Sequence, residues 1–383
     1  MIDIKEKDKC CGCHACFNIC PVNAITMKED ERGFKYPKVN NEKCINCGQC
    51  EKVCPVILNR KKEIEEDIET YAINNKNDEI RENSSSGGFF NLIANYILNN
   101  NGIVFGASFD EKWQVKHIEV KNKKDLIKLQ GSKYVQSSIG DTYKKAKEYL
   151  DNGKLVLFTG TPCQTEGLQT YLKKDYTNLY IQDIICHGVP SPKVWKKYLE
   201  YREKQDGQHP VQINFRQKDD GWNLYALLLQ YNNSAYKTNH SNDLFFKAFL
   251  RNVCLRDSCY NCSFKKWNRF SDITIGDFWG IDNIEPDMND DKGTSIVIIH
   301  SKKGRKLFDS IKKNCKYKEV NLKASVESYN WAYFKSVQKN SNTDIFFENL
   351  ENMEFDKLVK KYIEPSMLKR IARKIKMILN INK

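Results

Sequence analysis

Nine of the first 54 residues are cysteines, and eight of them form two copies of one spacing, C-x2-C-x2-C-x3-C-P. In this spacing, three thiolates one turn apart hold one 4Fe–4S cluster, and the fourth, followed by proline, ligates the other cluster. This crosswise rule assigns one cluster to Cys10, Cys13, Cys16 and Cys54. It assigns the second cluster to Cys44, Cys47, Cys50 and Cys20. The pattern therefore predicts a two-cluster ferredoxin module that carries electrons one at a time.

Zinc and disulfide bonds both explain the spacing of these cysteines less well than two 4Fe–4S clusters do. A zinc site needs two C-x-x-C pairs, or cysteine with histidine, and has no use for the third cysteine or the proline. Disulfides form in oxidising compartments, and we expect no signal peptide because the start, MIDIKEKDKC, is charged. Cys11 lies outside the pattern and is interpreted as a bystander thiol, and His14 is interpreted as a loop residue.

The composition favours a metal-binding protein of a reducing cytoplasm. The chain has 383 residues, enough for two or three domains, and 15 cysteines. The formal net charge is +13, but each oxidised 4Fe–4S cluster with its four thiolates carries about −2 and offsets part of this excess. We find no basic stripe with aromatic stacking partners, so nucleic-acid binding is not expected. No apolar run approaches the roughly 20 residues of a membrane span.

The chain divides into four predicted segments: a ferredoxin module at 1–58, a charged linker at 59–69, a large domain at 70–340 and a helical tail at 341–383. Strands are predicted in the large domain at 70–73, 102–109, 115–120, 155–160, 179–186, 211–218, 225–231, 273–279 and 295–300. Helices are predicted at 89–98, 122–130, 141–150, 164–172, 193–204, 244–250 and 306–314. We therefore expect an α+β chain, with a small ferredoxin-like domain followed by a larger α/β domain that has a mixed sheet.

Four further cysteines lie where an α/β domain binds ligands. Cys163 follows a predicted buried strand in GTPCQ, and Cys186 ends the next strong strand in DIICHGVPSP. Cys259 and Cys262 form a C-x-x-C loop, five residues after Cys254. Two strand-end cysteines and a C-x-x-C loop are sufficient for a third 4Fe–4S cluster. The alternative is that Cys163 and Cys186 are buried structural thiols.

Two loops have the composition of a phosphate site. The run Ser84-Ser85-Ser86-Gly87-Gly88 precedes a predicted helix, and backbone N–H groups at a helix N-terminus favour a diphosphate. Serine-rich helix caps are common, however, so this signal is weak alone. The loop 131–137 (GSKYVQS) supplies a cation and polar groups for the same ligand, or is an ordinary loop.

Six motifs occur in an order that resembles one family. They are SSSGGFF, GSKYVQS, LFTGTPCQTEGL, DIICHGVPSP, CLRDSCYNCSFK and RFSDITIGDFWGI. With the cysteine runs, they resemble the coenzyme F-420 hydrogenase/dehydrogenase beta-subunit family, in its bacterial form with a fused N-terminal ferredoxin, over roughly residues 5–300.

This resemblance implies two cofactors in the large domain, FAD and a third 4Fe–4S cluster beside it. The implied cluster ligands are Cys163, Cys186, Cys259 and Cys262, with Cys254 as the substitute for a strand-end cysteine. The implied FAD contacts are Ser86, Gly87, Gly88, Lys133, Tyr134 and Gln136.

The residues and the resemblance together predict an oxidoreductase. Electrons from ferredoxin or another low-potential carrier would enter at the N-terminal clusters, and the third cluster would pass them to FAD for two-electron reduction of an organic substrate. Many bacterial members of the family are associated with surface-polysaccharide synthesis, so the resemblance suggests a small-molecule or lipid-linked sugar substrate. Two alternatives stay open: a deazaflavin-dependent oxidoreductase of the same build, and a non-catalytic electron-transfer subunit.

Two residues are candidates for catalysis. His187 follows Cys186 and is a candidate proton donor near the flavin, and the alternative is an ordinary loop histidine. Asp277, in IGDFWG, is a candidate hydrogen-bond partner of the flavin or of the cluster loop, and the alternative is a turn cap.

The last residues form a separate feature. In 367–383, the apolar side chains of a predicted helix share one face and the lysines and arginines fall elsewhere. Such a helix lies peripherally on an anionic membrane surface, here the inner face, or packs on its own body or on another subunit. The sequence leaves the oligomeric state open.

Overall fold

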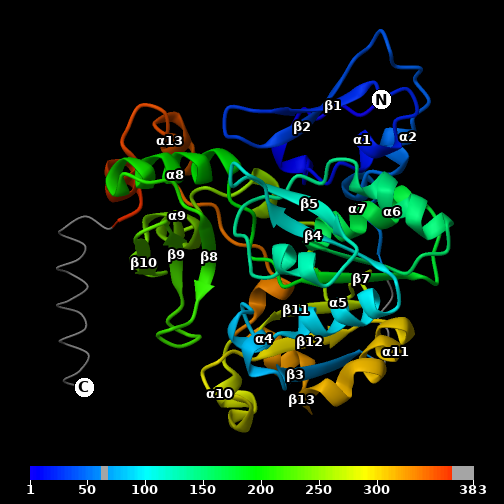
Figure 1. Ribbon diagram of the computed structural model, residues 1–383. Helices are drawn as coiled ribbons and strands as arrows, with labels where there is room; N and C mark the ends of the chain where they lie inside the picture. Colours follow the sequence, from blue (N-terminus) through cyan, green and yellow to red (C-terminus); the bar gives the residue numbers. More distant parts are fainter. Residues whose placement is uncertain (62–67, 365–383) are drawn as a thin grey trace.

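The computed structural model describes residues 1–61 and 68–364, and it shows a small N-terminal module beside a large mixed α/β body (Figure 1). Most of the predicted linker, and all of the predicted amphipathic helix at 367–383, lie outside the described residues. Within the described ranges, no helix is long and apolar enough to cross a membrane.

The N-terminal module consists mainly of its cysteine loops. Its regular elements are short: strands β1 (Ile25–Glu29) and β2 (Lys35–Val39), and helices α1 (Ala15–Ile19), α2 (Gln49–Lys52) and α3 (Pro55–Leu58). The two strands pair antiparallel, with Ile25 opposite Val39. Gly12 and Gly48 have φ values of 70° and 69°, in the left-handed region that glycine adopts at least cost. These turns fold each cysteine run back on itself.

The body is organised around a mixed sheet, as the sequence predicts. Among the described residues this sheet has eight strands, in the order β13 (Cys315–Glu319), β3 (Glu69–Asn75), β12 (Ser295–Ile299), β11 (Ile273–Asp277), β7 (Leu179–Ile184), β6 (Val156–Gly160), β4 (Ile103–Phe109) and β5 (Val115–Val120). The central strands β11, β7, β6 and β4 run parallel, and the outer strands pair antiparallel with their neighbours. The carboxyl ends of the parallel strands therefore meet at one edge, where open α/β sheets bind ligands.

Helices cover both faces of this sheet. They are α4 (Asp78–Glu82), α5 (Phe89–Asn99), α6 (Thr142–Asp151), α7 (Pro162–Leu172), α10 (Ile281–Ile284), α11 (Lys302–Ile311) and α12 (Leu322–Glu327). Leu157 packs under α5 and α11, whereas the next residue, Phe158, packs under α6 and α7. Successive side chains of a strand point to opposite faces, so both faces of β6 must be apolar. α1 and α3 of the N-terminal module contact α7, so the module sits on this second helical layer.

A second sheet, which the sequence did not separate from the first, lies between β7 and β11 along the chain. Its strands are β8 (Gln212–Gln217), β9 (Ala226–Gln230) and β10 (Ala235–Asn239), all antiparallel. Its helices are α8 (Pro192–Asp206), α9 (Leu244–Leu250), α13 (Thr343–Glu348) and α14 (Phe355–Tyr362). Phe346 and Leu358 are buried in the same core as Leu227 of β9. The described part of the predicted helical tail is therefore packed on the body.

Candidate functional site

Cys10, Cys13, Cys16 and Cys54 come together in the N-terminal module, and Cys13 also packs against the body. Burial raises the pKa of the Cys16 thiol, and the charges of Cys10 and Cys54 raise it further. The hydrogen bond from Cys11 lowers the pKa of Cys13, but burial and the charges of Cys16 and Cys54 leave it raised. These thiols are close enough to influence one another, and iron would displace their protons on binding.

Cys20, Cys44, Cys47 and Cys50 line a second, small cavity. Two backbone amides donate to its sulfurs, from Ala24 to Cys20 Sγ at 3.2 Å and from Ile2 to Cys50 Sγ at 3.3 Å. Hydrogen bonds to sulfur are one way in which a protein tunes a cluster's reduction potential. Cys47 is exposed at the module surface. The structure thus brings together the same two groups of four cysteines that the crosswise rule assigns.

A third group of cysteines forms a cage in the body. Cys163 is the second residue of α7, after β6; Cys186 follows β7; and the C-x-x-C loop supplies the other two. The cage cavity is lined by Cys163, Cys186, Cys259 and Cys262. Burial raises the pKa of Cys259, and the charges of the other three thiols raise it further. Among residues 1–61 and 68–364, no three Cys, His, Asp or Glu side chains converge closely enough to hold a single metal ion.

Two further cysteines of this region, the predicted substitute ligand Cys254 and the predicted bystander Cys11, lie in different places. Cys254 is fully buried in the core of the second sheet and does not line the cage cavity. Cys11 does line that cavity, and its thiol interacts with the thiols of both Cys13 and Cys163. The structure therefore gives Cys254 no place in the cage, and it places Cys11 between the first cysteine group and the cage.

A large cavity of about 490 Å³ lies at the carboxyl edge of the parallel strands. Its wall includes residues just after β6, β7 and β11, together with the Ser84–Gly88 and 131–137 loops. Four residues line both this cavity and the cage: Thr161, Cys186, Gly188 and Val189. The two sites therefore share a wall that is one layer of residues thick.

The two polar loops meet at this cavity. Ser132 donates from both its backbone N–H and its hydroxyl to Ser85 Oγ, at 2.8 and 2.9 Å. Ser86 Oγ donates to the Thr294 carbonyl at 2.8 Å, and Gly88 precedes α5 with a left-handed φ of 80°. Ser86, Gly88, Lys133 and Tyr134 line the cavity. The serine–glycine run therefore lies beside the cavity, at the start of a helix of 11 residues.

Gly87 and Gln136, two other predicted FAD contacts, do not line this cavity. A Cβ on Gly87 would lie 2.2 Å from the Ile73 carbonyl oxygen and 2.6 Å from the Ser295 nitrogen. Gly87 is therefore required by the close approach of two backbones. Gln136 faces the N-terminal module, where its Nε2 donates to the Cys11 carbonyl at 3.1 Å.

Two family models cover most of the body. The model of coenzyme F420 hydrogenase/dehydrogenase, beta subunit N-term, matches residues 70–142, and the model of its C terminus matches residues 153–325. The chain belongs to this family. A 4Fe–4S dicluster domain model matches residues 9–57, so this beta-subunit family member carries a fused iron–sulfur domain, as its motifs predict.

Comparison with individual proteins gives less information about this chain than the family models do. No match was found among the curated proteins. In the F420-reducing [NiFe] hydrogenase complex from Methanosarcina barkeri, one chain is 17% identical, with 76% of this chain and 90% of that chain covered and a TM-score of 0.45. Family membership and the dicluster domain identify this beta-subunit relative as an iron–sulfur subunit of oxidoreductase type.

In this family member, His187 stands at the wall between cage and cavity. It lines the large cavity directly after Cys186, and its Nε2 lies 2.7 Å from Asn252 Oδ1. An amide oxygen only accepts, so Nε2 carries the proton of this bond. Burial lowers the pKa of His187, and the bond to Asn252 partly opposes that effect. A neutral imidazole with a fixed tautomer therefore faces the cavity.

Asp277 lines the same cavity, but it is bound in an ion pair. Its Oδ1 lies 3.0 Å from Arg216 Nη2 and accepts from Trp222 Nε1 at 3.0 Å. Arg216 also donates to the Ser85 carbonyl at 3.2 Å, and its guanidinium lies 3.8 Å from the centre of the Tyr225 ring. Asp277 thus fixes a buried arginine that supports the serine loop.

The sequence did not single out His117, which also lines the cavity. Its Nε2 lies 2.9 Å from the Thr159 carbonyl oxygen and its Nδ1 lies 2.6 Å from Ser137 Oγ. Because a carbonyl only accepts, the Nε2 proton is fixed and Ser137 donates to Nδ1. Burial lowers the pKa of His117 to about 4. The sequence signal that could have identified His117 was its place at an inward-facing position of the predicted strand VKHIEV.

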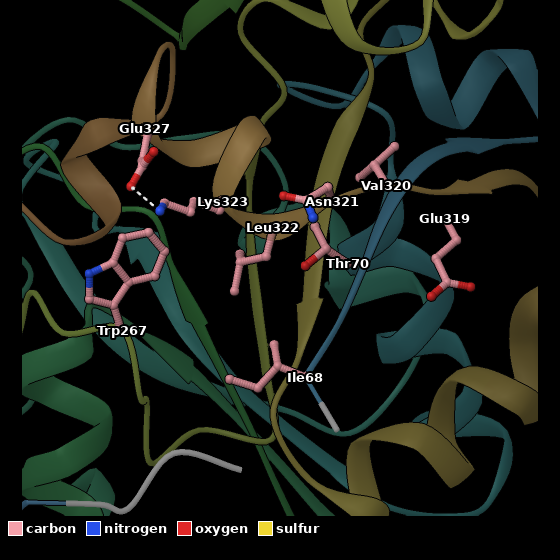
Figure 2. Close-up of a pocket in the computed structure, with 9 residues that line it drawn as sticks. All are labelled: Ile68, Thr70, Trp267, Glu319, Val320, Asn321, Leu322, Lys323 and Glu327. Carbon is pink, nitrogen blue, oxygen red and sulfur yellow. Dashed lines mark ion pairs between the residues drawn. The ribbon is translucent and has the colours of Figure 1, made fainter. Parts of the chain in front are cut away.

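A second large hollow, of about 840 Å³, lies at the opposite edge of the sheet (Figure 2). It is lined by Ile68, Thr70, Trp267, Glu319, Val320, Asn321, Leu322, Lys323 and Glu327. Lys323 and Glu327 form an ion pair of 3.9 Å on its rim. None of the predicted site residues lines it.

Proposed function

We propose that this protein is an iron–sulfur flavoprotein oxidoreductase that couples one-electron transfer to the two-electron reduction of an organic substrate. The observation that carries this proposal is the wall shared by the cysteine cage and the large cavity, formed by Thr161, Cys186, Gly188 and Val189. Groups held on its two sides would be close enough for direct electron exchange. The wall therefore joins the two kinds of site that such coupling requires.

The residues on each side of the wall fit these groups. Four cysteine sulfurs are the donor set of a 4Fe–4S cluster. A volume of about 490 Å³ is in the range of small-molecule sites, and a helix N-terminus with a nearby lysine favours a diphosphate. In this proposal Ser86, Gly88, Lys133 and Tyr134 hold FAD. When bound, FAD exchanges single electrons with iron–sulfur clusters and hydride with organic molecules.

The protein side chains supply orientation and proton control. Asn252 holds the imidazole of His187 in one tautomer, and Ser137 and the Thr159 carbonyl do the same for His117. Of these two, His187 is our candidate for proton transfer because it follows the cage residue Cys186 at the shared wall. Its Nε2–H is held by Asn252, so Nδ1 would take up a proton before donating one. In this proposal an electron carrier such as ferredoxin docks at the second cysteine group, and the exposure of Cys47 supports that choice.

The test is cofactor content in anaerobically purified protein. We expect about twelve irons, as three 4Fe–4S clusters require, and one FAD per chain. Cys163→Ala should lower the iron content by about four atoms, whereas Cys254→Ala, which removes a buried thiol outside the cage, should keep all the iron. Wild-type protein with about eight irons and no flavin would refute the proposal.

The substrate is a separate question, because it rests on the family alone. A sugar or lipid-linked intermediate of surface-polysaccharide synthesis and a deazaflavin are the two acceptors to compare. Reduced protein should be reoxidised by one class and not by the other. Reoxidation by a protein carrier alone would instead indicate a non-catalytic electron-transfer subunit.

A further inference from the structure

Arg256 is a body residue whose side chain hydrogen-bonds to two backbone carbonyls of the N-terminal module. It lies in the loop between Cys254 and the cage residue Cys259, and it is 1% exposed. Its Nε donates to the Cys10 carbonyl at 2.7 Å and its Nη2 donates to the Lys35 carbonyl at 3.1 Å. Both acceptors belong to the module. One guanidinium therefore holds the first cysteine run and strand β2 at the same time.

The surroundings of Arg256 are shaped to receive it. Its Nη1 donates to Gln136 Oε1 at 3.1 Å, and Gln136 in turn donates to the Cys11 carbonyl. The guanidinium carbon lies 4.2 Å from the centre of the Tyr36 ring, a cation–π contact. A Cβ on Gly12 would lie 2.9 Å from Nη1, so only glycine leaves room there. Gln136 thus links Arg256 to the first cysteine run, and it does not line the large cavity.

The charge of Arg256 has an unusual set of neighbours. Among the described residues, no carboxylate forms an ion pair with it. The groups that raise its pKa against the effect of burial are led by Cys10, followed by Tyr36, Cys11 and Cys259. A buried charge is costly unless it is paired. With clusters bound in both sites, the thiolates of the first cysteine group and of the cage would supply its counter-charge.

The two cysteine sites are adjacent at this point. The Cys11 thiol interacts with Cys13 of the first group and Cys163 of the cage, and both Cys11 and Arg256 line the cage cavity. We propose that Arg256 is a positioning residue that holds the first cysteine group against the cage and places one positive charge between the two iron–sulfur sites. This inference rests on the proposed function, because it requires clusters in both sites.

A positive charge between two anionic clusters favours their reduced forms, because reduction adds negative charge. Arg256→Gln should therefore shift the reduction equilibrium of the adjacent clusters about tenfold toward oxidation, which is 59 mV for a one-electron couple. Arg256→Lys keeps the charge but loses the fork of hydrogen bonds. It should leave the potentials close to wild type while hydrogen exchange at the amides around Cys10 becomes faster.

The experiment is a redox titration of anaerobic holoprotein followed by electron paramagnetic resonance, with iron content measured in parallel. Arg32→Gln is the matched control, because Arg32 also crosses the module boundary, to Asp257 and Asp344, at 3.2 and 2.7 Å. We expect wild-type potentials in this control. Equal shifts in Arg256→Gln and Arg32→Gln, or no shift in Arg256→Gln, would overturn the inference.

Failure of the proposed function would look different. If the wild-type protein contains only the clusters of the N-terminal module, the cage cluster is missing and the proposed function fails, independently of the Arg256 variants. If Arg256→Gln loses iron, the Arg256→Lys variant decides: wild-type potentials with faster exchange support the positioning role. Lowered potentials in Arg256→Lys would overturn the charge assignment.

Discussion

At the scale of single residues, Lys133 is the cation of the proposed diphosphate site in the cavity wall. The side chain is partly buried, and its Nζ donates to the Gln130 and Lys128 carbonyls at 2.7 and 3.0 Å. Burial lowers the pKa of Lys133 to about 7. A diphosphate beside it would favour the charged form and raise the pKa again. Anion binding should therefore be linked to proton uptake by this lysine.

This linkage fixes the direction of a pH effect. Below about pH 7 Lys133 is already charged, so FAD affinity should be highest and constant there. As the pH rises above that value, binding must also bring a proton to Lys133, and FAD affinity should fall. Flavin fluorescence titration of the deflavinated protein measures this trend. In Lys133→Gln the affinity should be lower and independent of pH over this range; a variant that keeps the wild-type profile would contradict the assignment.

At the scale of elements, α7 joins the module to the cage. Cys163, Gly167 and Thr170 follow the helical spacing that places residues on one face. Thr170 Oγ1 donates to the Val53 carbonyl of the module at 2.7 Å. A Cβ on Gly167 would lie 2.9 Å from Cys13 Cβ and 3.1 Å from Cys13 Sγ. The same helix face therefore carries a cysteine of the cage and contacts the first cysteine group.

Gly167→Ala tests this role of α7. In an ordinary helix the change gains about 1 kcal/mol of helix propensity. Here the added methyl group should displace Cys13, so we expect loss of the first module cluster, about four irons, with the secondary structure unchanged. Iron content and circular dichroism measure the two effects. Lys145→Ala, an exposed site on α6, is the control and should keep its iron; full iron in Gly167→Ala would show that Cys13 has room to move.

At the scale of the whole molecule, local patterns were predictable and distant contacts were not. The cysteine spacing identified a two-cluster iron–sulfur module, which the dicluster domain model supports, because most of each motif is local in sequence. The alternating strand signals identified the mixed sheet. Gln136 was placed with FAD because its loop was recognised, but a spacing does not say which way a side chain turns. Arg256 contacts the Cys10 carbonyl across 246 positions, and no local signal encodes such a contact. The second sheet was missed for the same reason: its strands were predicted, but their partners were not.

The distribution of charge leads to a prediction about electron entry. Cys47 is exposed, and Lys43 and Lys52 are exposed beside the second cysteine group. In a chain with a formal charge of +13, such lysines would attract an acidic carrier, and salt would weaken the attraction within a screening length of about 10 Å at 0.1 M.

Stopped-flow reduction of the protein by an acidic ferredoxin should therefore slow as ionic strength rises. The double variant Lys43→Gln/Lys52→Gln should be several-fold slower at low salt and lose most of the salt dependence, because neutral glutamines no longer steer the carrier. Lys302→Gln/Lys306→Gln on α11, far from the module in Figure 1, is the charge-matched control. If both double variants slow equally, net charge and not the rim of the second cysteine group governs the encounter. Reduction by a small uncharged reductant should be the same in all three proteins, because such a molecule is not steered by charge.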